Sequence, residues 1–268
     1  MLVVEDIALN QLLMKTLLDD FGFERDIAAN GLIAIEKLGQ KNYDIILMDL
    51  QMPEMNGFEA TEYIRKKMRS NIPIIALTAD VTTVDLEKCK AVGMNDYIAK
   101  PVDERILYSK IIGLVKNPAH SSQNPVGALP EEKMNSIAEP GEAPGDKKAR
   151  YTDLAYLINI TKYDRKLMME MIALYLQQTP DLVSLLKKSM QEEDWASLQA
   201  AAHKMIPSFS IIGIQKDFEN MAKKLQEYSG TKAQAKEMQD IVLQLEHVCT
   251  LACAELEEEY TILKNTKA

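Results

Sequence analysis

"YDIILMDLQMPEMNG", residues 43–57, is an apolar run that ends abruptly in an aspartate and a turn. Its first six residues are mostly apolar and include two β-branched isoleucines, which is typical of a strand buried on both faces of a sheet. Asp49 follows this run directly, and a segment containing Pro and Gly follows Asp49. We therefore predict a buried strand whose carboxyl end carries an aspartate exposed on a loop.

Similar apolar runs lie on both sides of this stretch and alternate with helical patterns such as "LNQLLMKTLLDDFG" (9–22). Alternating strands and helices are typical of a parallel α/β sheet. We predict a doubly wound, five-stranded parallel sheet within residues 1–116. Its other strands are expected at "LVV" (2–4), "FERDIAA" (23–29), "IPIIAL" (72–77) and "DYIA" (96–99).

The remainder of the chain divides into a linker and a second domain. Residues 117–150 hold five of the ten prolines and three of the eleven glycines, without sustained periodicity, which predicts a flexible linker. Residues 151–268 show helical spacing of apolar residues and no convincing strand. We expect an all-α, four-helix bundle there.

Composition restricts the possible functions. A net charge of −9 argues against a nucleic-acid partner, because phosphate neutralisation needs basic surface. No apolar run reaches the roughly 18–20 residues that cross a bilayer, so no membrane contact by this chain itself is expected. Three cysteines without paired spacing favour a reducing, cytoplasmic location. Cys249 and Cys253 are interpreted as core residues, and His120 and His247 are assigned no role.

A polar side chain follows nearly every predicted strand. Glu5 and Asp6 follow the first apolar run, Asp49 the central one, and Thr78 and Lys100 the last two. Because the carboxyl ends of parallel strands meet at one edge, these side chains should converge. Three close carboxylates repel one another and need a cation. An all-oxygen ligand set suits Mg²⁺ or Mn²⁺.

The same cluster indicates a reaction. Thr78 and Lys100 would supply a donor and a positive charge for an anion held beside the metal. Phosphoryl transfer to a carboxylate fits this arrangement, because its catalysis rests on positioning and charge neutralisation. Asp49 is the predicted acceptor.

The motifs "VVED" (3–6), "LMDLQMPEMNGFEAT" (47–61), "IIALTA" (74–79) and "YIAKP" (97–101) together resemble a response-regulator receiver domain, which has a flavodoxin-like fold. The resemblance covers residues 1–116. One departure is Ile7, where receivers of hybrid kinases commonly have Asn. The resemblance implies that Asp49 is the phosphoacceptor and that Mg²⁺ is bound by Glu5, Asp6, Asp49 and the backbone carbonyl of Gln51. It also implies that Thr78 and Lys100 bind the phosphoryl oxygens, that Thr78 and Tyr97 are switch residues, and that the Lys100–Pro101 bond is cis. The side chains of Gln51 and Asp80 would tune the lifetime of the aspartyl phosphate.

In the second domain, "AAHKMIPSFSIIG" (201–213) contains a histidine within a helical pattern. At 100° per residue, His203 lies about 140° from the apolar stripe, so we expect it to face outward. Ala200 and Ala201 would leave that outer surface open, and Lys204 would add positive charge beside a phosphoryl group. The stripe itself consists of Trp195, Leu198, Ala202, Met205, Phe209 and Ile212.

Residues 151–268 resemble the histidine-containing phosphotransfer domain, whose bundle carries a solvent-facing, phosphorylatable histidine. The resemblance implies that His203 is the phosphotransfer residue and that Lys204 and Gly213 support it. Ile206 and Pro207 stand where the family has Lys and Gly, and Lys204 is interpreted as replacing the missing charge.

Together these features predict a two-component phosphorelay protein whose partners are a histidine kinase domain and a downstream receiver. The sequence holds no Gly-rich ATP-binding motif, P-loop or kinase core, so only self-catalysed phosphoryl transfer and aspartyl-phosphate hydrolysis are expected. The start "MLVVED" favours the C-terminal part of a bacterial hybrid sensor kinase, with a free-standing relay protein as the other possibility. The alternative function is a receiver with a non-catalytic helical docking domain, regulated by phosphorylation of Asp49. The direction of phosphate flow and exchange between Asp49 and His203 within one chain are left open.

Overall fold

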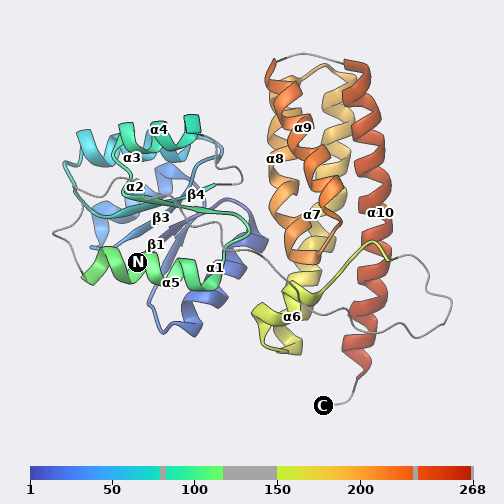
Figure 1. Cartoon of the computed structure of the whole chain (residues 1–268), viewed down its shortest axis with the longest axis horizontal. Helices are drawn as coiled ribbons and strands as arrows, with labels where there is room; N and C mark the ends of the chain where they lie inside the picture. Colours follow the sequence, from blue (N-terminus) through green and yellow to red (C-terminus); the bar gives the residue numbers. More distant parts are fainter. Residues whose placement is uncertain (79–82, 117–149, 232–234, 267–268) are drawn as a thin grey trace, which may run out of the picture.

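The computed structural model describes residues 1–78, 83–116, 150–231 and 235–266. It shows an α/β domain beside a helical domain (Figure 1). The predicted linker, apart from Arg150, lies outside the described residues, as does Asp80.

The α/β domain contains the five parallel strands that the apolar runs predicted. In the sheet they take the order β2-β1-β3-β4-β5, so the stretch that contains Asp49 supplies the central strand. The ladder pairs Val3 with Leu47 and Leu47 with Ile75, and all these strands run in the same direction. The bounds are β1 (Leu2–Val4), β2 (Asp26–Ala28), β3 (Ile46–Asp49), β4 (Ile74–Thr78) and β5 (Asp96–Ala99).

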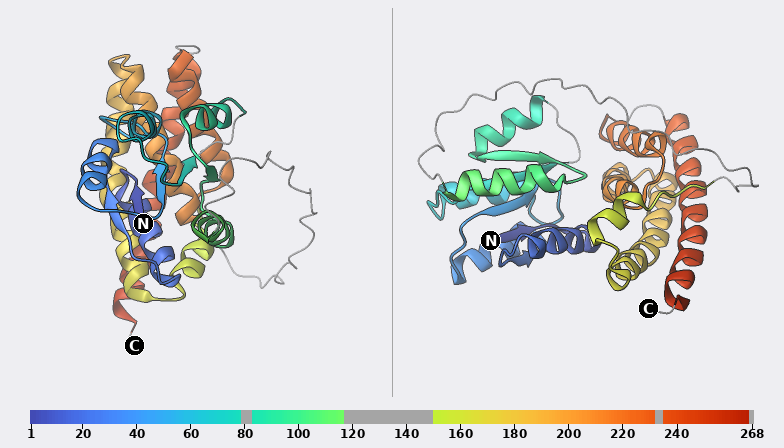
Figure 2. Two further views of the ribbon diagram at one scale, coloured as in Figure 1. Left: turned by 90° about the vertical axis from the view of Figure 1, so that its left-hand side faces the viewer. Right: turned by 60° about the horizontal axis from the view of Figure 1, so that its bottom comes forward.

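Helices cover both faces of the sheet (Figure 2). Alternate strand side chains point to opposite faces, so Val3 and Leu47 pack with α1 and α5, whereas Val4 and Met48 pack with α2, α3 and α4. This arrangement confirms the predicted doubly wound, flavodoxin-like architecture. The helices are α1 (Ala8–Asp20), α2 (Gly31–Gln40), α3 (Gly57–Lys66), α4 (Thr83–Val92) and α5 (Glu104–Lys116).

The described part of the second domain is entirely helical. Its long helices are α7 (Arg165–Gln191), α8 (Trp195–Ile212), α9 (Lys216–Thr231) and α10 (Ala235–Asn265). Helix α8 packs against α7 and α9, and α10 packs against the same two helices. Tyr175 and Phe209 are among the largest side chains in the core between them. The short α6 (Ala155–Thr161) was not predicted.

The two domains meet along α1, which contacts α6, α7 and α8. In the second view of Figure 2, α1 extends from the sheet toward the helical domain. This contact brings the carboxyl edge of the sheet close to α8. Within the described residues, none of the helices combines the length and apolar character needed to span a bilayer.

Gly213 ends α8 in the left-handed region, with φ of +69°. A Cβ atom there would lie 1.9 Å from the carbonyl oxygen of Asp153, so both backbone conformation and space require glycine. We expect Gly213→Ala to lower the free energy of unfolding of the helical domain by about 2–3 kcal/mol. Urea denaturation followed by circular dichroism measures this loss.

Gly230→Ala is the matched control in the same domain. Gly230 lies within α9, and an added Cβ would meet only the flexible end of the Gln199 side chain. Alanine also has the higher helix propensity, so the control should change stability by less than about 1 kcal/mol. Equal unfolding curves for the two variants would contradict the role given to Gly213.

Candidate functional site

The predicted acidic cluster forms at the carboxyl edge of the sheet. Glu5 directly follows β1, and Asp49 is the last residue of β3. One carboxylate oxygen from each of Glu5, Asp6 and Asp49 lies within 4.8 Å of the others. The convergence that strand order predicted for these three side chains is therefore present.

Asp49 is buried, contrary to the expectation of an exposed loop residue. Its carboxylate contacts the Lys100 ammonium, and the turn that follows folds back over the strand end. The amide of Gln51 donates to Asp49 Oδ1 at 3.4 Å, and the amide of Gly57 donates to the carbonyl of Leu50. The sequence predicted the turn, but it did not predict that the turn packs against the end of β3 and buries Asp49.

Gly57 is a site residue that the sequence reasoning did not single out. A Cβ atom at this position would lie 2.2 Å from the Asp49 carbonyl oxygen. Glycine therefore allows α3 to begin directly against the strand that carries Asp49. The side chain of Asn56 caps this helix by accepting hydrogen bonds from the amides of Phe58 and Glu59. The signal in the sequence is the Asn-Gly pair shortly after Pro53.

Glu5 is fully buried and held by the start of α1. Asn10 donates from Nδ2 to Glu5 Oε1 at 3.0 Å, and the amide of Ile7 donates to the same oxygen at 3.2 Å. Gln11 donates to the Glu5 backbone carbonyl at 2.6 Å. Helix α1 thus fixes the orientation of this carboxylate.

Lys100 joins two of the carboxylates. Its Nζ lies 2.7 Å from Glu5 Oε2 and 2.8 Å from Asp49 Oδ2. Burial disfavours the charged ammonium, but Asp49 and Glu5 outweigh it, so the pKa of Lys100 is raised. Burial also raises the pKa of Glu5, an effect that Lys100 opposes. The Lys100–Pro101 bond is cis, as the resemblance implied.

Asp6 makes the cluster suitable for a cation. Its side chain is 5% exposed, and its Oδ2 forms an ion pair with the Lys204 ammonium of α8 at 2.8 Å. A buried carboxylate needs a compensating partner. Three oxygen donors of this kind, beside solvent-derived ligands, match the preference of Mg²⁺ or Mn²⁺.

Thr78 and Tyr97 lie on the two strands beyond Asp49. Thr78 ends β4 and is buried, and its carbonyl accepts from the amide of Lys100 at 2.7 Å. Tyr97 is half-buried on β5, and the Nζ of Lys110 lies 5.1 Å from the centre of its ring. Thr78 therefore lies at the edge of the sheet at which the acidic cluster forms, whereas Tyr97 pairs with Ala76 in the middle of β4.

His203 is only 5% exposed, which corrects the prediction of an open, outward-facing histidine. A helical wheel considers one helix alone and cannot include a second domain that covers its outer face. The receiver groups Lys100, Glu5 and Asp6 all act electrostatically on the imidazole, so this face of α8 points toward the acidic cluster. Ala201 is also buried, although it too was expected on the open surface, while Ala200 is exposed.

The His203 ring has one contacted nitrogen and one uncontacted nitrogen. Gln226 Nε2 lies 3.5 Å from His203 Nδ1 and donates to Gln51 Oε1 at 3.0 Å, so it spans the two domains. His203 Nε2 is buried and has no hydrogen-bond partner among the described residues. Burial and, after it, Lys100 lower the pKa of His203 to about 4, against the opposing effect of Glu5 and Asp6. The ring is therefore neutral at pH 7 and keeps a lone pair.

Two further polar contacts join the domains through residues near α6. Lys162 Nζ lies 2.8 Å from Asp20 Oδ2, and the Tyr156 hydroxyl donates to the carbonyl of Val102 at 3.2 Å. Burial raises the pKa of Tyr156 to about 12, so this hydroxyl stays a donor. Sequence reasoning predicted none of these contacts, since the two partners in each lie in different domains and far apart in the sequence.

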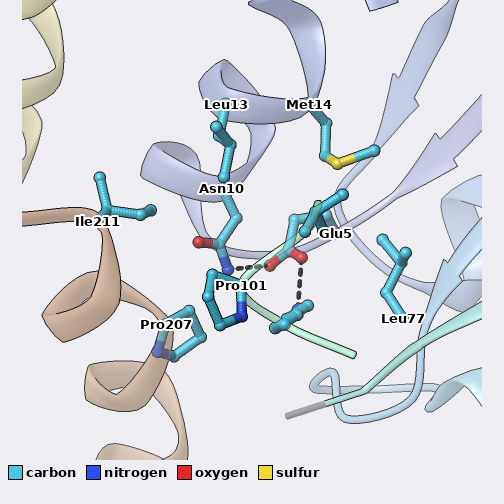
Figure 3. Close-up of a pocket in the computed structure, with 10 residues that line it drawn as sticks. Glu5, Asn10, Leu13, Met14, Leu77, Pro101, Pro207 and Ile211 are labelled. Carbon is cyan, nitrogen blue, oxygen red and sulfur yellow. Dashed lines mark hydrogen bonds and ion pairs between the residues drawn. The ribbon is translucent and has the colours of Figure 1, made fainter. Parts of the chain in front are cut away.

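Apolar side chains complete the contact between the domains. Pro207 and Ile211 of α8 line a small cavity whose other walls come from the receiver (Figure 3). Asn10 and Leu13 of α1 and Glu5 face them across it. The cavity is small: its volume of about 10 Å³ is at the lower limit for holding one water molecule.

Fold and site together define a known class for the first domain. Residues 1–112 match the response regulator receiver domain, and this part of the chain is a receiver domain homologous to those of hybrid histidine kinases. The family match ends before the helical domain.

Among curated proteins, the sensor protein GacS of Pseudomonas syringae pv. syringae is 40% identical over 131 residues. The sensor protein EvgS of Escherichia coli is 27% identical over 215 residues, an alignment that covers 80% of the chain and so extends into the helical domain. The GacS alignment covers 46% of this chain. The chain spans only 14% of the length of GacS and 16% of the length of EvgS.

Among solved structures, the chain is similar to the receiver domain of the sensor histidine kinase PA1611 from Pseudomonas aeruginosa. That domain has a magnesium ion coordinated in its active-site cleft. The identity is 37%, the match covers 43% of this chain and 95% of that domain, and the TM-score is 0.40.

Proposed function

We propose that this chain is a two-site phosphorelay protein, in which Asp49 of the receiver accepts a phosphoryl group and His203 of the helical domain exchanges it. The receiver identity supports a role in two-component signalling. In this proposal the helical domain is a histidine-containing phosphotransfer domain built as a four-helix bundle. A histidine kinase domain would be the donor, and another receiver would be the downstream partner.

At the receiver, an Asp49 carboxylate oxygen attacks the phosphorus of a phosphohistidine. The phosphorus–nitrogen bond breaks as the oxygen–phosphorus bond forms, and the donor imidazole keeps the electron pair. Lys100 and Thr78 would bind the phosphoryl oxygens. Glu5, Asp6, Asp49 and the Gln51 carbonyl would hold Mg²⁺, which when bound neutralises negative charge on the transferred group.

At the second site, the His203 Nε2 lone pair attacks the phosphorus of the aspartyl phosphate. The bond to Asp49 breaks, and the carboxylate recovers its negative charge, which Lys100 stabilises. In the tautomer that leaves the Nε2 lone pair free, the ring proton lies on Nδ1, beside the Gln226 side chain. The switch role of Tyr97 and Thr78 belongs to the same proposal.

One observation carries the proposal most directly. His203 Nε2 is buried beside the acidic cluster, is uncharged at pH 7, and has no hydrogen-bond partner within the described residues. A buried polar nitrogen without a partner is costly, and such groups are concentrated at functional sites. A purely structural histidine would be expected to satisfy both ring nitrogens.

His203→Gln tests the proposal. The chain is incubated with Mg²⁺ and a radiolabelled, phosphorylated histidine kinase domain, and the two proteins are then separated. Phosphohistidine survives alkali and is lost in acid, whereas acyl phosphates are labile to alkali. We expect alkali-stable label on the wild type and its complete loss in His203→Gln.

His247→Gln is the matched control, because His247 is exposed on α10 and has no role in the proposed transfer. It should keep the alkali-stable label. Label that is entirely alkali-labile in the wild type and in both variants would leave Asp49 as the sole acceptor. The helical domain would then be the docking domain of the alternative function.

A further inference from the structure

Lys204 is the cation that the helical domain contributes to the acidic cluster. Its Nζ lies 2.8 Å from Asp6 Oδ2, so the two side chains form an ion pair between the domains. The Lys204 side chain is 35% exposed, whereas that of Asp6 is 5% exposed. The contact therefore joins a flexible ammonium to a carboxylate that is almost closed to solvent.

The distribution of charge explains why this contact matters. The Lys100 ammonium forms ion pairs with Glu5 and Asp49, the other two carboxylates of the acidic cluster. Among the described residues, Lys204 is the ion-pair partner of Asp6. A buried carboxylate without a cation is unfavourable, so the docked helical domain supplies the charge that Asp6 lacks.

We propose that Lys204 and Mg²⁺ compete for Asp6, so that docking of the helical domain and metal binding oppose each other. The inference rests on the proposed function, which assigns Asp6 to the metal. Both cations need the same carboxylate, and bringing both to it adds repulsion between them. Because coupling is reciprocal, Lys204 lowers the affinity of the receiver for Mg²⁺ and Mg²⁺ loosens the docked α8 by the same factor.

Isothermal titration of the whole chain with MgCl₂ measures the first effect. Lys204→Met removes the charge and keeps the length of the side chain. We expect the dissociation constant for Mg²⁺ to fall by about tenfold, within the usual range of coupling between two sites. Lys204→Arg keeps the charge and should bind Mg²⁺ as the wild type does.

Lys187→Met is the matched control. Lys187 pairs with Glu246 on the surface of the helical domain, with Nζ and Oε1 2.6 Å apart, so its removal takes the same charge from the same domain. It should leave the Mg²⁺ affinity unchanged. An equal gain in affinity for Lys187→Met and Lys204→Met would reduce the effect to net charge and overturn the proposal.

Amide hydrogen exchange measures the reciprocal effect. Adding Mg²⁺ to the wild type should speed exchange in α6 and in the part of α8 around Lys204, and this response should be absent in Lys204→Met. Unchanged exchange on Mg²⁺ addition to the wild type would contradict the coupling.

The outcome is separable from that of the proposed function. Equal Mg²⁺ affinities for wild type and Lys204→Met would refute the competition but leave Asp49 and His203 untouched. If no variant bound Mg²⁺, the metal assignment itself would be wrong. Neither titration nor exchange depends on phosphoryl transfer, which the His203→Gln labelling tests on its own.

Discussion

Asp49→Asn should abolish phosphoryl acceptance by the receiver. The substitution keeps the size of the side chain, but a neutral amide oxygen cannot form a stable acyl phosphate with the incoming group. If His203 is loaded only through the receiver, the alkali-stable label on the helical domain should disappear as well. The labelling assay with a phosphorylated histidine kinase domain measures both populations.

Asp44→Asn serves as the control, because Asp44 is exposed and precedes β3 at the opposite end of the strand. It should accept label as the wild type does. Alkali-labile label that persisted in Asp49→Asn would place the acceptor elsewhere. Alkali-stable label alone in that variant would mean that His203 receives phosphate directly from the kinase.

Lys100→Met should destabilise the receiver domain when Mg²⁺ is chelated. The variant leaves Glu5 and Asp49 without the ammonium that now lies 2.7 and 2.8 Å from their oxygens. Removing one partner from a buried ion pair typically costs about 3–5 kcal/mol. Urea unfolding in EDTA should show a loss of that size, and saturating Mg²⁺ should restore part of it.

Lys110→Met provides the comparison. Lys110 also pairs with an aspartate, Asp96, at 2.5 Å, but both side chains are partly exposed. An exposed pair of this kind contributes at most about 1 kcal/mol. If Lys100→Met in EDTA unfolded no more easily than Lys110→Met, the ion pairs of the acidic cluster would not stabilise the fold.

The sheet and the acidic cluster could be predicted because their signals are local. Each buried strand is a short apolar run, and the rule that parallel strands share one carboxyl edge then brings Glu5, Asp49 and Lys100 together. The register does not come from this signal, because β1 and β3 are apolar on both faces and show no alternation of apolar and polar residues.

The burial of His203 could not be predicted, because it depends on a second domain and not on α8. The helical wheel placed His203 off the apolar stripe of α8. The receiver residues near it, such as Lys100 and Glu5, lie about 100 and 200 positions away in the sequence. The seven residues of α6 were missed for a related reason. A helix of two turns gives too little periodicity to recognise, and its stability comes from packing against α1 and its neighbours.

Helix α1 holds Glu5 through Asn10 and Gln11 and also touches the helical domain with Leu13 nearby. The same short helix therefore contacts the helical domain and orients a carboxylate of the acidic cluster, which matters for any redesign of the partner that the receiver binds. Changes at its outer positions would alter which domain it accepts. Changes at Asn10 or Gln11 would also disturb the Glu5 carboxylate. Domain contact and carboxylate orientation can therefore be redesigned separately only toward the end of α1.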